Sequence, residues 1–318
     1  KIAPALAFGN SVIWKPANLT PASAVAFAEI IHRQGMPEGT FNLLLGGGSS
    51  VGDALINSTD IDAVSFTGSV PTGRKVAAAT APNFIRCQLE MGSKNALVIA
   101  DDADLQVAID AAVAGAFGGS GQKCTASSRL IVMDSIHDAF VEGVIAKMKT
   151  LKVGHALDDG IFMGPVVDDK QLASNMDWIE KAKQSGANLA FGGERLEMPH
   201  DGYYMSPTLF TETDNSWDIN QEEVFAPLAC VMRVKDLDEA IAMTNDTRFG
   251  LTGGIITQSL RSSAMFKEQV QAGCVMVNLA TAGTDYHVPF GGRKQSSFGP
   301  REQGQYAKEF YTIVKTAY

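Results

Sequence analysis

Short apolar runs alternate with longer amphipathic segments along the first part of the chain. Between two such runs, Val25, Ala28 and Ile31 share one helical face, with a Thr-Pro pair before them and Gly35 after them. The pattern predicts strands at 11–14, 41–45 and 63–66, and helices at 20–34, 49–57 and 69–81. Strands and helices that alternate in this way are typical of a parallel α/β sheet.

The alternation resumes after residue 92 with a second set of elements. We predict strands at 95–100, 129–133, 229–234, 252–257 and 274–278, and helices at 105–117, 136–151, 168–186, 237–245 and 259–268. A looser stretch between them, residues 192–220, is expected to hold short strands around Tyr204 and Leu209. The final segment is glycine-rich, then helical, then extended. The chain therefore divides into residues 1–92, 93–289 and a C-terminal tail, 290–318.

Composition restricts the possible partners and compartment. The 318 residues carry a net charge of −9 with a sequence pI near 5.1, which argues against nucleic acid or an anionic membrane as a partner. No apolar run reaches the ~20 residues of a membrane helix, and no signal peptide is visible. The four cysteines are widely spaced without a CxxC pair, which favours reduced thiols. We expect a cytoplasmic protein without a metal site.

Two stretches carry candidate chemistry. Cys124 follows the run FGGSGQK, in which glycines permit a tight turn, and the adjacent cation of Lys123 favours a thiolate. A buried structural cysteine is the alternative. Glu90 lies between apolar residues at the end of a strand-like run, where burial raises the pKa of a carboxyl toward that of a general base. A solvated turn glutamate is the alternative there.

These two stretches, LEMGSK and GQKCTASSR, resemble the signature motifs of the NAD(P)-dependent aldehyde dehydrogenase superfamily, in order and in spacing. The resemblance extends from Lys1 to Tyr318. GQKCTASSR and PFGGRKQSSFGPREQG are most similar to the 2-oxoglutarate semialdehyde (2,5-dioxopentanoate) dehydrogenases. The implied fold is a partial Rossmann-type cofactor domain followed by an α/β catalytic domain. Compared with the family, the chain lacks upstream strands and an oxyanion-binding asparagine, so we expect an N-terminally incomplete chain.

The resemblance implies a covalent mechanism. The Cys124 thiolate would attack an aldehyde to give a thiohemiacetal, and hydride transfer to the nicotinamide would leave a thioester. Glu90 would activate the water that hydrolyses this thioester. Glu302, in Pro-Arg-Glu, aligns with a family carboxylate that assists proton movement, although its spacing from Phe290 is one residue longer than usual.

The resemblance also implies a site for NAD or NADP. Gly68, Ser69 and Gly73 follow a strand and open a helix, where free N–H groups favour a phosphate. An ordinary strand-to-helix turn is the alternative. The adenosine-ribose segment would contribute Lys15 and Asn18, and the nicotinamide-ribose segment would contribute Glu223 and Phe225. Asn18 replaces a glutamate that repels the 2′-phosphate of NADP in many relatives, so both cofactors stay open.

The implied substrate is a short aldehyde with a distal carboxylate. Phe290 would line the aldehyde tunnel, and Arg293 would hold the carboxylate in a bidentate pair. Arg301 and Lys123 are rival cations, and a solvated Arg293 is the alternative. The family resemblance further implies a homo-oligomer, either a dimer or a tetramer.

Other functional classes remain to be compared with this hypothesis. A coenzyme A-acylating aldehyde dehydrogenase lacks the general-base glutamate, so Glu90 argues against it. A cysteine hydrolase is disfavoured because none of the five histidines lies in a recognisable nucleophile-pairing motif. An inactive fragment or a non-catalytic scaffold with the same fold is the alternative that an incomplete chain leaves open.

Overall fold

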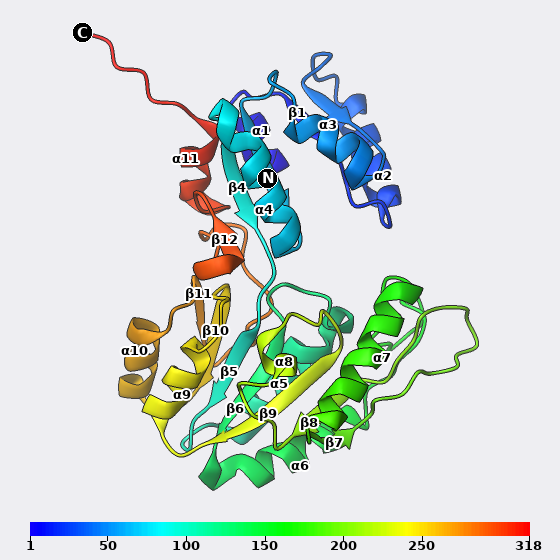
Figure 1. Cartoon of the computed structure of the whole chain (residues 1–318), viewed down its shortest axis with the longest axis vertical. Coiled ribbons are helices and arrows are strands. Elements are labelled where there is room, and N and C mark those ends of the chain that lie inside the picture. Colours follow the sequence, from blue (N-terminus) through cyan, green and yellow to red (C-terminus); the bar gives the residue numbers. More distant parts are fainter. The chain divides into compact units, whose positions relative to one another are not determined.

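The computed structural model describes all 318 residues and contains two compact units (Figure 1). The first unit comprises Lys1–Met91, Thr284–Gly291 and Ser297–Tyr318. The second unit comprises Gly92–Gly283 and Gly292–Ser296. Residues of the glycine-rich tail therefore contribute to both units.

The first unit is built from short elements that form two small sheets. Strands β1 and β2 pair in parallel in one sheet, and the order of the other is β12-β4-β3, in which only the β12–β4 pair is antiparallel. Its elements are α1 (Ile2–Ala7), β1 (Val12–Trp14), α2 (Pro21–Arg33), β2 (Phe41–Leu43), η1 (Gly48–Gly52), α3 (Asp53–Ile56), β3 (Ala63–Thr67), α4 (Val70–Thr80), η2 (Ala81–Asn83), β4 (Arg86–Glu90), β12 (Ser297–Phe298), η6 (Gly304–Tyr306) and α11 (Ala307–Tyr311).

The second unit is organised around a seven-stranded sheet of order β11-β10-β5-β6-β9-β8-β7. All neighbours pair in parallel except β7 and β8. Its elements are β5 (Asn95–Ile99), α5 (Leu105–Phe117), η3 (Gly118–Gly121), β6 (Ser127–Met133), η4 (Asp134–Ile136), α6 (His137–Met148), α7 (Asp169–Gln184), β7 (Asn188–Phe191), β8 (Thr208–Thr211), α8 (Asp218–Gln221), β9 (Leu228–Val234), α9 (Leu237–Asn245), β10 (Thr252–Ile256), α10 (Leu260–Gln269), β11 (Cys274–Val277) and η5 (Lys294–Ser296).

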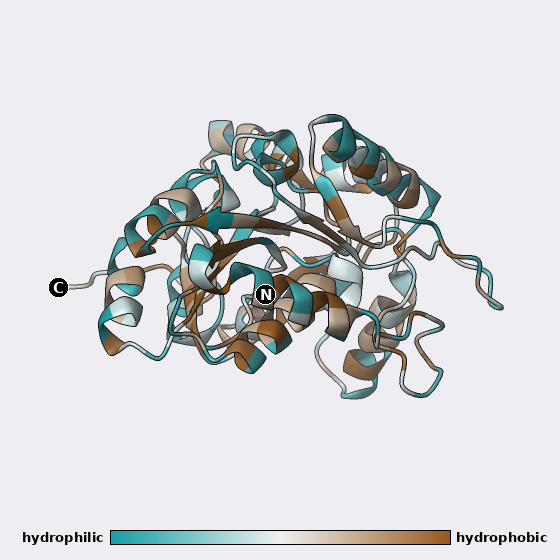
Figure 2. Ribbon diagram, turned by 90° about the horizontal axis from the view of Figure 1, so that it is seen from below, coloured by the Kyte–Doolittle hydropathy of each residue, from teal (hydrophilic) through white to brown (hydrophobic).

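Both faces of this sheet are buried, which explains why its central strands are apolar throughout. In β5, Leu97 and Ile99 pack into a cluster with α5 and α6, whereas Ala96 and Val98 pack into a cluster with α9 and α10. This alternation is the period-2 geometry of a strand. Figure 2 shows the resulting concentration of hydrophobic residues on the strands and the more mixed character of the helices. No helix is long and apolar enough to cross a membrane.

Most predicted elements are confirmed within a few residues, and α5 and α9 agree at both ends. The region around Tyr204 is a correction, because only a single bridge pair, Arg195 with Met205, forms there. The strands β7 and β12 were not predicted. Each is short and gains its hydrogen bonds from a distant partner strand, so neither leaves a periodic signal in the sequence.

Candidate active site

Cys124 follows a left-handed turn at the end of α5. Gly119, Ser120 and Gly121 have φ values of 64°, 58° and 63°, a conformation that costs energy for any residue other than glycine. The Ser120 hydroxyl offsets this cost by donating to the carbonyl oxygens of Gly164 and Pro165, at 2.9 and 3.2 Å. The glycine-rich run therefore does form a tight turn.

Asn95, at the first position of β5, fixes the backbone on either side of this cysteine. Its side-chain amide donates to the carbonyl oxygens of Cys124 and Ala126, at 2.8 and 3.0 Å. Its carbonyl oxygen accepts from the Ser93 hydroxyl and from the Thr252 N–H, at 2.7 and 3.0 Å. Because Asn95 is buried and fully hydrogen-bonded, it holds the cysteine segment against the start of the sheet. Cys124 itself is partly buried.

Glu90 is the last residue of β4 and is only 3% exposed. Burial raises the pKa of this carboxyl to about 7, while the Ser297 hydroxyl and the charges of Lys1 and Arg301 lower it. The Ser297 hydroxyl donates to Glu90 Oε2 at 2.5 Å. The resulting group is half-ionised near neutral pH, which is the property of an effective general base.

Glu302 lies in the first unit, like Glu90, and its carboxylate is paired with Lys1. Its backbone forms an antiparallel bridge with Phe290, through N–O distances of 2.7 and 2.8 Å. Its carboxylate forms an ion pair with Lys1 Nζ, and Lys1 also donates to the Ser65 hydroxyl at 2.8 Å. Burial lowers the pKa of Lys1 to about 8. Two titratable groups, Lys1 and Glu90, therefore have pKa values close to neutrality within the first unit.

The structure brings Lys15 and Asn18 together beside a helix start. Lys15 Nζ donates to the carbonyl oxygens of Pro16 and Gly46, at 2.8 and 3.2 Å, and to Asn18 Oδ1 at 3.4 Å. Gly46 directly precedes the turn that opens η1. A cation and an amide thus lie together at the start of η1, beside the carbonyl oxygen of Gly46.

Gly68, Ser69 and Gly73 surround the start of α4. The Gly68 N–H donates to the Glu90 carbonyl oxygen at 3.0 Å. The Ser69 hydroxyl caps the helix by accepting from the Thr72 N–H at 3.4 Å. An added Cβ at Gly73 would lie 2.3 Å from the Met91 sulfur, so this glycine permits close packing of α4 rather than facing solvent.

The two adjacent glutamates of the second unit have different environments. Glu222 forms an ion pair with Arg248. Glu223 instead faces Gly92 and accepts from the Ser93 N–H at 3.0 Å, and burial raises the pKa of its carboxyl. Phe225 follows with a left-handed φ of 59° and a partly exposed ring. Glu223 therefore packs against Gly92 and Ser93, whereas Glu222 is held by Arg248.

The predicted substrate residues lie in different surroundings. Phe290 is buried in the first unit. Arg293, in the second unit, is exposed and without an ion-pair partner, and its N–H donates to the Gly250 carbonyl oxygen at 2.8 Å. Lys123 is exposed and folds back over Gly119. Arg301 lies against Gly291 in the first unit, beside Glu90 Oε1.

Sequence reasoning missed the residues that hold the candidate groups: Asn95, Lys1 and Ser297. Asn95 was detectable in principle, because it begins an otherwise apolar strand, and a polar side chain buried there needs hydrogen-bond partners. Lys1 and Ser297 left no such signal, since each meets its partners only through distant segments of chain.

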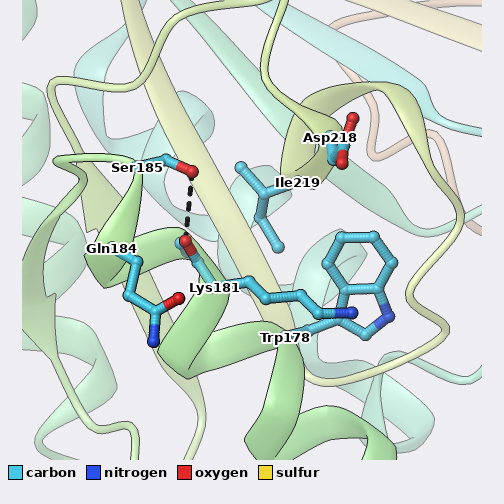
Figure 3. A pocket seen from close by; sticks show the side chains of 7 residues that line it. Trp178, Lys181, Gln184, Ser185, Asp218 and Ile219 are labelled. Atoms are coloured by element: carbon cyan, nitrogen blue, oxygen red, sulfur yellow. Dashed lines mark hydrogen bonds between the residues drawn. The ribbon is translucent and has the colours of Figure 1, made fainter.

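One cavity lies away from these residues. It is a surface hollow of about 210 Å³ between the end of α7 and α8, lined by Trp178, Lys181 and Ile219 among others (Figure 3). A smaller cavity of about 20 Å³ is bordered by Lys94, Lys123 and Glu223, close to the cysteine turn. Lys94 is almost fully buried there, and burial lowers the pKa of its ammonium to about 8.

The chain is similar to known dehydrogenases over its whole length. The chain is 40% identical over its whole length to the alpha-ketoglutaric semialdehyde dehydrogenase of Bacillus subtilis and to the 2,5-dioxopentanoate dehydrogenase of Saccharolobus solfataricus, and it spans 66% of the length of each. A crystal structure of betaine aldehyde dehydrogenase from Staphylococcus aureus in complex with NAD+ matches 98% of the chain with a TM-score of 0.95 and 36% identity, over 62% of that protein. The model of the family described as "Aldehyde dehydrogenase family" matches residues 1–317. The chain therefore belongs to the aldehyde dehydrogenase family.

Proposed function

We propose that the complete protein oxidises an aldehyde to the carboxylic acid with NAD+ or NADP+ as hydride acceptor. The observation that carries this proposal is Glu90, a buried carboxylate whose pKa of about 7 suits a general base. Such a residue is needed for hydrolysis of a thioester and not for transfer to another thiol. Family membership and the turn that presents Cys124 supply the remaining parts.

The cysteine performs the first half of the reaction. The Cys124 thiolate attacks the carbonyl carbon, and the carbonyl electron pair moves to oxygen, where the Cys124 backbone N–H stabilises it. Collapse of this oxyanion expels a hydride to the nicotinamide and leaves a thioester. The bound cofactor supplies the hydride acceptor, while the chain supplies the nucleophile and its orientation through Asn95.

Glu90 performs the second half. Its carboxylate accepts a proton from water as the water oxygen attacks the thioester carbon, and the C–S bond then breaks to release the acid and the thiolate. The proton must leave Glu90 before the next cycle. Lys1 and Glu302 lie in the same unit and form a pair through which this proton could reach solvent.

The cofactor residues are proposed on the arrangement of their elements. Lys15 would bind the adenosine ribose, with Asn18 beside it, and the start of α4 beside Gly68 and Ser69 would bind phosphate, while Gly73 lets α4 pack against Met91. Glu223 and Phe225 would contact the nicotinamide ribose and ring. Asn18 carries no negative charge, so NADP+ would be used as well as NAD+.

The proposed substrate is a short semialdehyde with a distal carboxylate, such as 2-oxoglutarate semialdehyde. The two semialdehyde dehydrogenases at 40% identity support this choice. Phe290 would line the aldehyde tunnel. Arg293 is exposed and has no ion-pair partner, so its guanidinium is available for a carboxylate.

We also propose a homo-oligomer. The extended residues after α11 (Figure 1) expose Ile313 and Val314, at 82% and 91%, which is typical of a strand that pairs with another chain.

The substrate proposal is tested by comparing kcat/KM for 2-oxoglutarate semialdehyde, succinate semialdehyde and pentanal, followed as NAD(P)H absorbance. Arg293→Ala should reduce kcat/KM for the carboxylated aldehydes about 10-fold or more, because a hydrogen bond to a charged group contributes about 1.5–3 kcal/mol. Pentanal should be unaffected. Arg261→Ala, which removes an exposed arginine of α10, serves as the matched control.

Two outcomes would contradict the proposal at different levels. Preference for pentanal by the unmodified protein would remove the semialdehyde assignment and leave a general aldehyde dehydrogenase. The absence of NAD(P)H formation with every aldehyde would remove the activity itself.

A further inference from the structure

The pairing of β12 with β4 places a hydroxyl directly opposite the candidate general base. Ser297 is the cross-strand partner of Glu90, and Phe298 is the partner of Leu89. Directly opposed side chains in an antiparallel pair lie on the same face, within contact distance. A shift by one residue would replace the hydroxyl by the exposed ring of Phe298, so the register itself delivers Ser297 to the carboxylate.

Close approaches of glycines keep this register in place. An added Cβ at Gly299 would lie 2.2 Å from the Cys87 carbonyl oxygen, so β12 can reach β4 only if this position lacks a side chain. Gly291 has the same property on the other side of the carboxylate, where an added Cβ would lie 2.9 Å from Glu90 Oε1. Neither position can carry a side chain, because Gly299 lies against β4 and Gly291 lies beside Glu90 Oε1.

The contact between Ser297 and Glu90 is short and involves the Oε2 atom of the carboxylate. The Ser297 hydroxyl donates to Glu90 Oε2 at 2.5 Å, within the range of charge-assisted hydrogen bonds. The other charged groups around the carboxylate are Lys1, which directly precedes α1, and Arg301 from the segment after β12, with Glu302 paired to Lys1. Both cations lower the pKa of Glu90 by their charge, and Ser297 binds its Oε2 through a hydrogen bond.

We propose that Ser297 is a positioning residue for Glu90, holding Oε2 in a fixed place and stabilising the carboxylate charge during thioester hydrolysis. This inference rests on the proposed function. The hydroxyl donates its proton to the ionised carboxylate, so it favours the form of Glu90 that accepts a proton from water. No covalent bond to Ser297 forms or breaks.

Deletion of the hydroxyl should change the pH dependence of one step only. In Ser297→Ala, the midpoint of the pH profile for thioester hydrolysis should move upward by about one unit, since one unit corresponds to about 1.4 kcal/mol and a hydrogen bond to a charged group contributes at least that much. Hydrolysis should therefore be about 10-fold slower below the wild-type midpoint and nearly normal well above it. The first burst of NAD(P)H should keep its amplitude.

The experiment uses rapid mixing of the complete protein with aldehyde and cofactor, from about pH 5.5 to 9.5, a range that brackets the ionisation of a buried carboxyl. Four variants are compared with the unmodified protein: Ser297→Ala, Ser297→Thr, Ser297→Cys and Ser185→Ala. Ser297→Thr retains a hydroxyl and should restore the original midpoint. Ser297→Cys retains size with a weaker donor and should give an intermediate midpoint. Ser185→Ala removes a hydroxyl that bonds to the Lys181 carbonyl oxygen and should change nothing.

The outcomes separate this inference from the proposed function. If the unmodified protein forms no NAD(P)H with any aldehyde, the proposed function fails. If it forms NAD(P)H and Ser297→Ala loses rate equally at all pH values, with the midpoint unmoved, Ser297 has only a structural role and the inference is wrong. If Ser297→Ala does not fold, an unshifted midpoint in Ser297→Cys would overturn the inference just as well.

Discussion

At the residue scale, the candidate catalytic groups owe their properties to neighbours that hold or bury them. Glu90 acquires a pKa of about 7 because desolvation outweighs the Ser297 hydrogen bond and two nearby cations. Asn95 connects the cysteine segment to the start of the sheet through four hydrogen bonds. The chemical character of a side chain here is therefore set by burial and hydrogen bonding as much as by its type.

Replacement of Glu90 by Gln should separate the two halves of the reaction. The near-isosteric amide cannot accept a proton, so thioester hydrolysis should slow by about 10²–10⁴-fold. Hydride transfer should be little changed, because the Cys124 thiolate drives it. A stoichiometric burst of NAD(P)H followed by slow turnover is the expected stopped-flow record.

The same measurement has a pH signature. In the unmodified protein, hydrolysis should fall as the pH drops below about 7, where Glu90 becomes protonated and can no longer accept a proton. Glu90→Gln should lose this dependence. Equal slowing of the burst and of turnover would instead assign Glu90 a structural role.

At the element scale, the turns between elements position the candidate groups. The turn after α5 contains successive left-handed residues at Gly119, Ser120 and Gly121. Gly121 also approaches a second segment closely, since an added Cβ would lie 2.1 Å from the Ala226 carbonyl oxygen. Gly118 has an ordinary φ of −57°, and its added Cβ would meet only the end of the Lys123 side chain, at 3.6 Å.

These two glycines should therefore respond differently to alanine. Gly121→Ala should lower the free energy of unfolding by about 2 kcal/mol or more, because it adds left-handed strain and a backbone clash. Gly118→Ala should change it by less than about 0.5 kcal/mol, as is usual for a substitution that meets no obstacle. Urea unfolding of both variants measures the difference. Equal midpoints would show that the turn can relax and that Gly121 is dispensable.

At the scale of the whole molecule, the candidate groups are distributed between two compact units. Lys15, Asn18, Glu90 and Glu302 belong to the first unit, and Cys124, Glu223 and Arg293 belong to the second. The groups proposed to bind adenosine and to act as nucleophile thus belong to separately packed parts of the chain. Each should be removable without loss of the other.

Cys124→Ala should abolish aldehyde oxidation in the complete protein while changing the Kd for NAD+ by less than about 3-fold, since it removes only a sulfur atom from a segment that Asn95 holds by its backbone. Lys15→Met should have the reciprocal effect. It should weaken NAD+ binding about 10-fold or more and leave the reactivity of the Cys124 thiol toward an alkylating reagent intact. Calorimetry and thiol titration measure the two quantities. Appreciable turnover by Cys124→Ala would rule out the covalent mechanism.

The sequence by itself determined the class of fold, most elements and the family. Hydrophobic periodicity placed α5 and the strands of the second unit, because burial of both sheet faces demands apolar runs there. The motifs around Glu90 and Cys124 identified the family, since each motif is a short stretch of sequence that can be recognised without the fold.

Only the tertiary structure decided which groups meet. The Ser297–Glu90 contact joins residues 207 positions apart, and it depends on a two-residue strand without any periodic signal. The roles of Asn95 and Lys1, and the different environments of Glu222 and Glu223, likewise follow from contacts between distant segments. Hydrophobic patterning specifies which face of an element is buried, but it carries no information on which polar partner the packed backbone brings opposite a given side chain.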